Sequence, residues 1–198
     1  MLTVGHIPQD LGRDPDVIRT LGRAQLYQAL ERASSYDAWH IAAALEPEDL
    51  EELFTLLAPP LGSPRESLSL AFGGMAIECG EAYEIMPNGR TADAVLAGLR
   101  RGRHCSLDWY LGSQRPAAIA REATAQANLI FAFAQREPRD IDFLAESVSQ
   151  PFADQVRQLH LGDYRCVVHN VDDGTSRVLD RDRRTIGRLD EMAGAAGQ

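Results

Sequence analysis

The chain has 198 residues, of which 44% are hydrophobic and 25% charged, the composition of an ordinary globular protein with a sizeable core. Its formal net charge is −9, which excludes a protein that grips nucleic acid by overall charge; DNA contact would need a local arginine patch, an oligomer or a partner. All 20 Lys and Arg positions are arginine, which excludes lysine chemistry at phosphates, Schiff bases or general bases.

The three cysteines, Cys79, Cys105 and Cys166, are an odd number at wide spacings. They form no metal-ligand pattern, which favours a reducing compartment. No apolar run approaches the ~20 residues that span a bilayer, and no charged-then-apolar leader is found. The sequence therefore predicts a cytoplasmic protein without a membrane span.

Short apolar runs alternate with longer amphipathic ones, which predicts an α/β layered domain. In chain order, we expect a strand at 1–7, a loop at 9–16, a strand at 17–20, a helix at 21–33, a strand at 39–45, and helices at 47–58 and 66–72. Next come a buried strand at 75–79, a helix at 91–101 capped by Thr91, a strand at 104–111, a helix at 117–126 and a strand at 128–134. Helices at 138–148 and 152–160 precede a β-hairpin, whose strands 164–170 and 176–179 flank Asp172-Asp173-Gly174.

Strands separated by helices imply right-handed crossovers and a mostly parallel sheet flanked by helices. We expect one α/β domain over residues 1–179, followed by a flexible tail at 180–198, where charged and small residues dominate. In parallel sheets, ligands bind at the carboxyl ends of the strands. The residues that follow the strands 75–79 and 104–111 are therefore the first candidates for a functional site.

Four short motifs stand at such positions. Gly80-Glu81-Ala82-Tyr83 follows the buried strand 75–79, and Arg100-Arg101-Gly102-Arg103-His104 ends the next helix. Gly112-Ser113-Gln114-Arg115-Pro116 follows the next strand, and the apolar strand 128–134 leads to Asp140-Ile141-Asp142. Each motif alone is weakly specific, but their order and spacing together carry more information.

In that order and spacing the chain resembles the FtsK–HerA superfamily of P-loop ATPases, which includes genome-packaging ATPases of membrane-containing viruses. Members typically carry a strand ending in Asp-Glu-Ala, a helix ending in Gly-Arg-His or Gly-Arg-Lys, and a strand ending in Thr-Gln-Arg-Pro. A further apolar strand then leads to an Asp-containing helix. The resemblance covers roughly Val17 to Leu144 and implies an ASCE P-loop NTPase-like fold.

The resemblance also implies roles for particular side chains. Glu81 would polarise the water that attacks a γ-phosphate, and Gln114 would sense that phosphate or hold the water. An arginine near a subunit boundary would neutralise charge on the phosphate of the adjacent subunit, with Arg101, Arg103 and Arg115 as candidates. We expect Glu81 and Gln114 to lie side by side at the tips of adjacent parallel strands.

The chain departs from the family pattern at two places. The metal-holding Asp expected before Glu81 is Gly80, and Glu78, on the same face of the strand, is the weak substitute as a metal ligand. No G-x-x-x-x-G-K-[ST] phosphate loop occurs, and the segment from Gly5 to Gly12 lacks both its spacing and its lysine. The first strand resembles the family's second strand, so we expect the chain to start downstream of the phosphate-binding unit.

Three functions remain open on the sequence. The favoured one is a degenerate or partial DNA-translocase or packaging subunit without autonomous ATP hydrolysis. It would act in a homo-oligomer or beside a partner ATPase, with ATP, Mg²⁺ and double-stranded DNA as the implied cofactors and partner. The second is an active ATPase in which arginine replaces lysine. The third is a non-enzymatic assembly or virion-associated protein that uses the fold for protein contacts, in which case Glu81 and Gln114 are ordinary polar residues.

Overall fold

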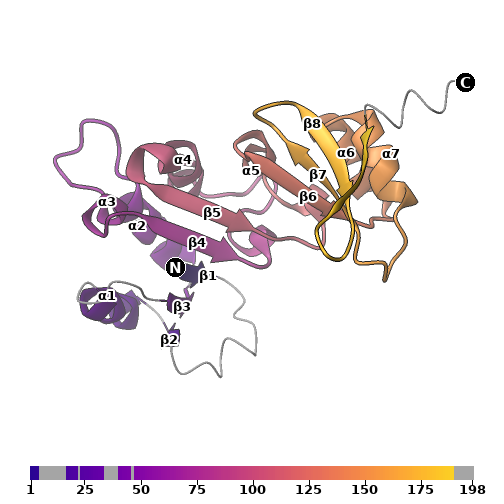
Figure 1. Cartoon of the computed structure of the whole chain (residues 1–198). Coiled ribbons are helices and arrows are strands. Elements are labelled where there is room, and N and C mark those ends of the chain that lie inside the picture. Colours follow the sequence, from indigo (N-terminus) through magenta and orange to yellow (C-terminus); the bar gives the residue numbers. More distant parts are fainter. Residues whose placement is uncertain (5–16, 22, 34–39, 46, 190–198) are drawn as a thin grey trace, which may run out of the picture. The chain divides into compact units, whose positions relative to one another are not determined.

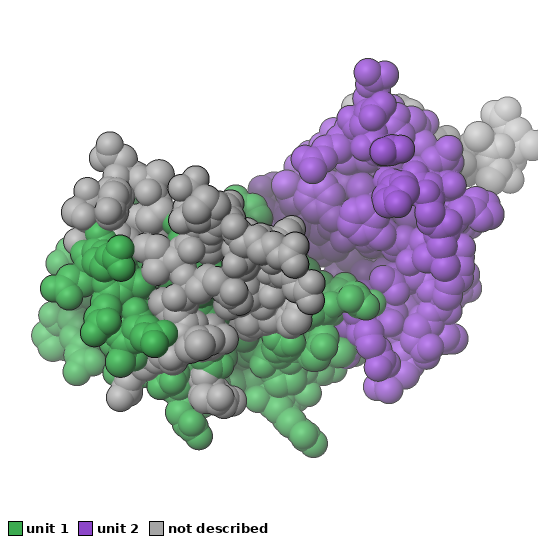
Figure 2. All heavy atoms as spheres, turned by 90° about the horizontal axis from the view of Figure 1, so that it is seen from below, with its two compact units in different colours: residues 1–114, 118–123 green, residues 115–117, 124–198 purple. Residues whose placement is uncertain are grey.

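The computed structural model describes residues 1–4, 17–21, 23–33, 40–45 and 47–189. The expected loop at 9–16 and Trp39 lie outside the described residues. Contacts group the chain into two compact units, the first of residues 1–114 with 118–123 and the second of 115–117 with 124–198 (Figure 2). The expectation of one domain over residues 1–179 stays a prediction.

The first unit is built on a five-stranded, fully parallel sheet with the strand order β2-β3-β1-β4-β5 (Figure 1). Its strands are β1 (Leu2–Val4), β2 (Val17–Leu21), β3 (His40–Ala44), β4 (Met75–Cys79) and β5 (Leu107–Leu111). Strands β4 and β5 pair in register from Met75↔Leu107 to Cys79↔Leu111, so both end at the same edge of the sheet. The parallel sheet expected from the sequence is confirmed in this unit.

The helices of the first unit bury an aromatic core against the sheet. They are α1 (Arg23–Ala33), α2 (Pro47–Leu57), α3 (Leu68–Ala71) and α4 (Asp93–Arg101), with the short 3₁₀ segments η2 (Ala82–Glu84) and η3 (Gly102–Cys105). Helix α2 packs on α4, and the fully buried Phe54 of α2 stacks on Trp109 of β5 with ring centroids 5.0 Å apart. The adjacent Tyr110 is 61% exposed, as alternation along a strand requires.

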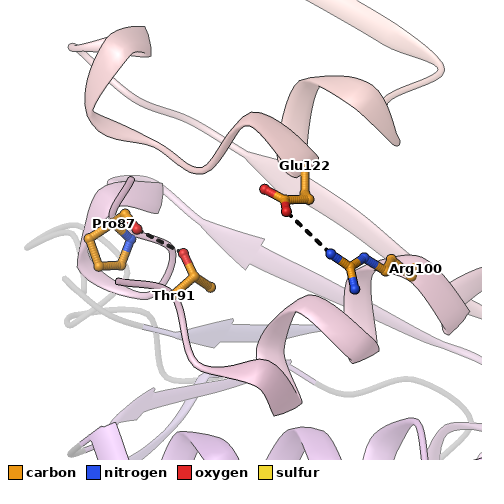
Figure 3. Close-up of polar contacts among 4 residues, drawn as sticks. All are labelled: Pro87, Thr91, Arg100 and Glu122. Carbon is orange, nitrogen blue, oxygen red and sulfur yellow. Dashed lines mark hydrogen bonds and ion pairs between the residues drawn. The ribbon is translucent and has the colours of Figure 1, made fainter. Parts of the chain in front are cut away.

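Helix α4 begins later than the sequence predicts. Its N-cap is Ala92, which makes no side-chain capping bond, whereas Thr91 was expected to cap the helix. The Thr91 hydroxyl instead donates to the Pro87 carbonyl oxygen at 2.9 Å (Figure 3). A threonine hydroxyl can bond either to the helix that follows it or to the turn that precedes it, and here it bonds to the turn.

The second unit contains a four-stranded antiparallel sheet with the order β6-β7-β8-β9. Its strands are β6 (Leu129–Phe133), β7 (Cys166–Asn170), β8 (Thr175–Leu179) and β9 (Thr185–Arg188), and its helices are α6 (Pro138–Ser147) and α7 (Gln150–Gln158). Helix α7 packs on β7, where Phe152 meets the His169 ring edge-on. Two shorter helices, η4 (Pro116–Ala118) and α5 (Arg121–Ala125), connect β5 to β6.

Strand β6 corrects one expectation from the sequence. The alternation of strands and helices placed it in the parallel sheet, but it pairs antiparallel with β7, from Leu129↔Asn170 to Phe133↔Cys166. An apolar strand carries no signal for the direction of its neighbour, and β7 lies far along the chain, so the pairing is decided only by tertiary contacts.

The expected hairpin is confirmed as β7 and β8, joined through Asp172-Asp173-Gly174. Regular structure continues past this hairpin. Strand β9 lies within the stretch 180–198 that was expected to be a flexible tail. The Asp180 carboxylate accepts the Arg184 amide at 2.8 Å and closes the turn between β8 and β9. Residues 190–198 lie outside the described residues. Among the helices that the structure describes, none combines the length and apolar character needed to cross a membrane.

Candidate functional site

The structure brings Glu81 and Gln114 together. Glu81 lies two residues past the end of β4 and Gln114 three residues past the end of β5. The backbone N–H of Gln114 donates a long hydrogen bond, 3.5 Å, to a Glu81 carboxylate oxygen. Glu81 is half-buried and Gln114 is exposed, so the pair sits at the surface of the sheet's carboxyl edge. A carboxylate and an amide at this edge are suited to orient a water or a polar ligand.

Backbone hydrogen bonds join the ends of β4 and β5, next to this pair in the chain. The Gly112 amide donates to the Cys79 carbonyl at 2.8 Å, and the Ala82 amide donates to the Gly112 carbonyl at 2.7 Å. A Cβ atom at residue 112 would lie only 2.9 Å from the Gly80 carbonyl oxygen. Because no side chain fits in that gap, glycine at 112 is what allows the two segments to approach.

A second set of contacts joins the loops further from the strands. The Ala120 amide donates to the Met86 carbonyl and the Asn88 amide to the Ala118 carbonyl, both at 2.8 Å. An ion pair of 3.2 Å joins Arg100 on α4 to Glu122 on α5 (Figure 3). Both of its side chains are exposed, so its contribution to stability is small, and the backbone bonds are what hold the loops.

The position before Glu81 is open. A Cβ atom built on Gly80 would have no atom within 4 Å, and its backbone lies outside the left-handed region that favours glycine. Packing therefore does not require glycine there, in contrast to Gly112. The metal candidate Glu78 is half-buried on β4. In the part of the chain that the structure describes, no three His, Cys, Asp or Glu side chains gather as a metal site. The role of Glu78 stays a prediction.

Two of the three candidate arginines lie away from this pair. Arg101 ends α4 and Arg103 lies in η3, both before the start of β5, whereas Gln114 follows its end. The length of a five-residue strand, about 15 Å, separates the two edges. The Arg101 side chain donates to the Ala97 carbonyl of its own helix at 3.2 Å. Arg115 directly follows Gln114 in the chain and is exposed, so it is the candidate nearest the pair in sequence.

One buried acid was given no role by the sequence analysis. Asp140 in the first turn of α6 is only 2% exposed, and its carboxylate accepts the Ala117 amide at 2.9 Å. Both residues belong to the second unit, so this bond ties the segment 115–117, just after Gln114, to that unit. An acid two residues after Pro138 at a helix start was the available signal, but helix starts favour acids for other reasons too.

The Cys79 thiol, at the end of β4, is expected to be unreactive. Burial is the main cause that raises its pKa to about 11, and the carboxylates of Glu84, Glu81 and Glu78 add to the rise. A raised pKa in the folded state contributes stability that is present below the unfolded thiol's pKa and is lost as pH rises through about 11.

We expect a thiol reagent to modify Cys79 at pH 8 only through unfolding, so that the rate of modification rises with urea. A Cys79→Ala chain measures the background reaction of the other cysteines. Rapid modification without urea would contradict this.

No protein-family model matches the chain, and no curated protein sequence matches it. Solved structures do. The genome packaging NTPase B204 from Sulfolobus turreted icosahedral virus 2, in complex with AMPPCP, superposes with a TM-score of 0.61 at 18% identity, over 89% of this chain and 94% of that one. The DNA-packaging ATPase from Sulfolobus Turreted Icosahedral Virus gives a TM-score of 0.57 at 16% identity, over 82% and 96%.

At this level of identity the likeness concerns the fold alone. It extends over nearly the whole of the viral proteins. The chain therefore has the same α/β fold as these two viral proteins.

Proposed function

We propose that this chain is a degenerate or partial DNA-translocase or genome-packaging subunit that acts in an assembly, in the cytoplasm or the virion, without hydrolysing ATP by itself. The contact between Glu81 and Gln114 at the ends of adjacent parallel strands carries the proposal. The fold shared with viral packaging NTPases supports it, since ligands of such sheets bind at this edge.

The residues of this chain would supply only part of the chemistry of ATP hydrolysis, and other subunits of the assembly would supply the rest. Glu81 would polarise a water and Gln114 would hold it or sense a phosphate. Arg101, Arg103 or Arg115 would reach a nucleotide held by an adjacent subunit, because the first two lie away from the chain's own Glu81. The chain has no lysine for the phosphates and has Gly80 where a Mg²⁺-holding Asp is expected. ATP and Mg²⁺ would therefore be bound jointly with a partner, and double-stranded DNA would be the load.

ATP turnover tests the proposal. We expect the isolated wild-type chain and Glu81→Gln to show the same background turnover, because the substitution removes a carboxylate from a site that cannot complete the reaction alone. In an assembly with a partner ATPase, Glu81→Gln is expected to slow turnover by about 10²-fold. Mg²⁺-dependent turnover by the isolated wild-type chain that is lost in Glu81→Gln would contradict the absence of autonomous hydrolysis.

A second candidate is a non-enzymatic assembly protein, which the acidic net charge and the open Gly80 position favour. Thermal unfolding with and without a non-hydrolysable ATP analogue separates the two, since a ligand that binds the folded state raises its melting temperature. A stable complex with a partner, no shift with nucleotide and no change in the anisotropy of a fluorescent duplex DNA would select this second function over the first.

A further inference from the structure

Asn88 differs from the other asparagines of the chain in the residue that follows it. The sequence contains three asparagines, at positions 88, 128 and 170, and only Asn88 precedes a glycine, whereas the other two precede leucine and valine. The carboxamide nitrogens of those two donate to aspartates, Asn128 to Asp172 at 3.3 Å and Asn170 to Asp173 at 3.1 Å. The chain therefore contains its own comparison for any reaction between an asparagine and the residue after it.

Asn88 and Gly89 are the two central residues of a tight turn. The turn is closed by a hydrogen bond of 3.1 Å from the Arg90 amide to the Pro87 carbonyl oxygen. Gly89 has a φ of +72°, a left-handed conformation that glycine adopts without strain. Asn88 and Gly89 are both exposed, and a Cβ atom at residue 89 would meet no atom within 4 Å. The backbone conformation of the turn, and not packing, is therefore what favours glycine here.

The backbone N–H of Gly89 takes no part in the hydrogen bonds that hold this turn. In the part of the chain that the structure describes it makes no hydrogen bond, whereas the Asn88 and Arg90 amides donate to the Ala118 and Pro87 carbonyls. An amide nitrogen must lose its proton before it can attack a carbonyl carbon, and a hydrogen bond from that N–H would oppose the loss. Glycine also carries no side chain that would hinder the approach. The Gly89 nitrogen is therefore able to act as a nucleophile.

We propose that Asn88 is a site of spontaneous deamidation in the folded chain. The Gly89 nitrogen, after losing its proton, attacks Cγ of Asn88. The bond from Cγ to the carboxamide nitrogen breaks, and this nitrogen takes up a proton and leaves as ammonia. Water then opens the resulting five-membered succinimide at either of its carbonyl carbons. Attack at Cγ gives aspartate, and attack at the main-chain carbonyl carbon gives isoaspartate, whose main chain runs through Cβ and Cγ. Water is the only co-reactant.

The isoaspartate product loosens the turn. It inserts one more atom into the main chain between Pro87 and Arg90, the residues that the closing hydrogen bond joins. The Pro87 carbonyl oxygen also accepts the Thr91 hydroxyl at 2.9 Å, just before α4 (Figure 3). Both bonds depend on the length of this short segment. Each product also adds one negative charge to a chain whose net charge is −9. The inference rests on residues 87–91 and does not depend on the proposed function.

Peptide mass spectrometry of the full chain after incubation in mildly alkaline buffer tests the proposal. We expect residue 88 to gain about 1 Da, as its amide becomes a carboxyl group. Its rate should be at least about tenfold higher than the rates at Asn128 and Asn170, because only glycine leaves the attacking nitrogen unhindered. The rate should also rise with pH, because the nitrogen attacks without its proton.

Two glycine variants separate the reaction from strain in the fold. Gly89→Ala is expected to slow the reaction at Asn88 by at least about tenfold, because its methyl group hinders the nitrogen. Gly73→Ala is the matched control. Gly73 has a φ of +74° and, like Gly89, no atom within 4 Å of a built Cβ, so the substitution causes similar backbone strain and should leave the reaction at Asn88 unchanged.

The same measurement in urea decides whether the fold permits the reaction. We expect the rates at Asn88 in the folded and unfolded chains to agree within about tenfold, because no hydrogen bond of the turn must open at the Gly89 N–H. An Asn88 that reacts in urea but stays intact in the folded chain would overturn the proposal. Equal rates at all three asparagines, or an unchanged rate in Gly89→Ala, would overturn it as well.

Hydrogen exchange at the Arg90 amide tests the effect on the turn. Its protection should fall in the fraction that contains isoaspartate and persist in Asn88→Asp, which has the new charge but a main chain of ordinary length. Equal protection in both chains would contradict the loosening of the turn.

Discussion

Replacement of Gly112 by alanine is expected to lower the free energy of unfolding of the first unit by about 3 kcal/mol, at the upper end of overpacking costs. The new methyl group would lie 2.9 Å from the Gly80 carbonyl oxygen, which is backbone and cannot rotate away. The two strand ends must therefore separate, which strains the bonds from Gly112 to Cys79 and from Ala82 to Gly112. The contact between Glu81 and Gln114 rests on the same segments and should be lost as well.

Urea unfolding followed by tryptophan fluorescence measures this effect, because both tryptophans of the chain lie within residues 1–114. Gly80→Ala is the matched control at the same edge. Its methyl group would meet no atom within 4 Å, so a change within about 0.5 kcal/mol is expected. Equal stability of the Gly112→Ala and Gly80→Ala chains would show that the two strand ends are not in tight contact.

Replacement of Asp140 by alanine is expected to destabilise the second unit by about 2 kcal/mol. The side chain is buried and accepts the Ala117 amide, which would lose its partner while its surroundings stay partly closed to water. The substitution also removes a negative charge from the first turn of α6, where it interacts favourably with the helix dipole. Amide hydrogen exchange is the direct measurement, since protection of the Ala117 amide should fall with the loss of its acceptor.

Asp140→Asn separates the hydrogen bond from the charge. The asparagine amide oxygen can still accept the Ala117 amide, so protection should be largely kept and the loss of stability should be less than half of that in Asp140→Ala. This unit contains no tryptophan, so its unfolding is followed as the part of the circular dichroism change in urea that tryptophan fluorescence does not report. If Asp140→Asn were as unstable as Asp140→Ala, the charge of Asp140 and not its bond to Ala117 would be what matters.

Local signals in the sequence were sufficient for most helices and strands. Pro47 with the acids behind it marked the start of α2, and the short apolar run at 75–79 became β4 without change. Thr91 shows where such signals fail, because its hydroxyl can serve either the helix after it or the Pro87 carbonyl before it. The strand β9 was missed since its charged surroundings resemble a tail, and only the turn closed by Asp180 pairs it with β8.

For the candidate site too, some features could be predicted from the sequence and others could not. The neighbourhood of Glu81 and Gln114 could be expected because parallel strands in register end at one edge, and the structure brings the two together. Whether they act on a nucleotide stays a prediction. The order of the elements already implied that Arg101 and Arg103 lie at the opposite end of β5. A sequence motif alone, however, does not specify at which edge of the sheet its residues lie.

By itself, the sequence determined the chemical limits of this protein: an acidic chain with no lysine, whose alternating apolar runs require an α/β fold. These properties are set by composition and local periodicity, which are written residue by residue. Only the tertiary structure decided that β6 pairs antiparallel with β7, that Gly112 must be glycine while Gly80 need not be, and that Asp140 holds Ala117. Each of these depends on residues distant in the chain meeting in space, where packing and hydrogen bonding, which no local pattern encodes, select among partners.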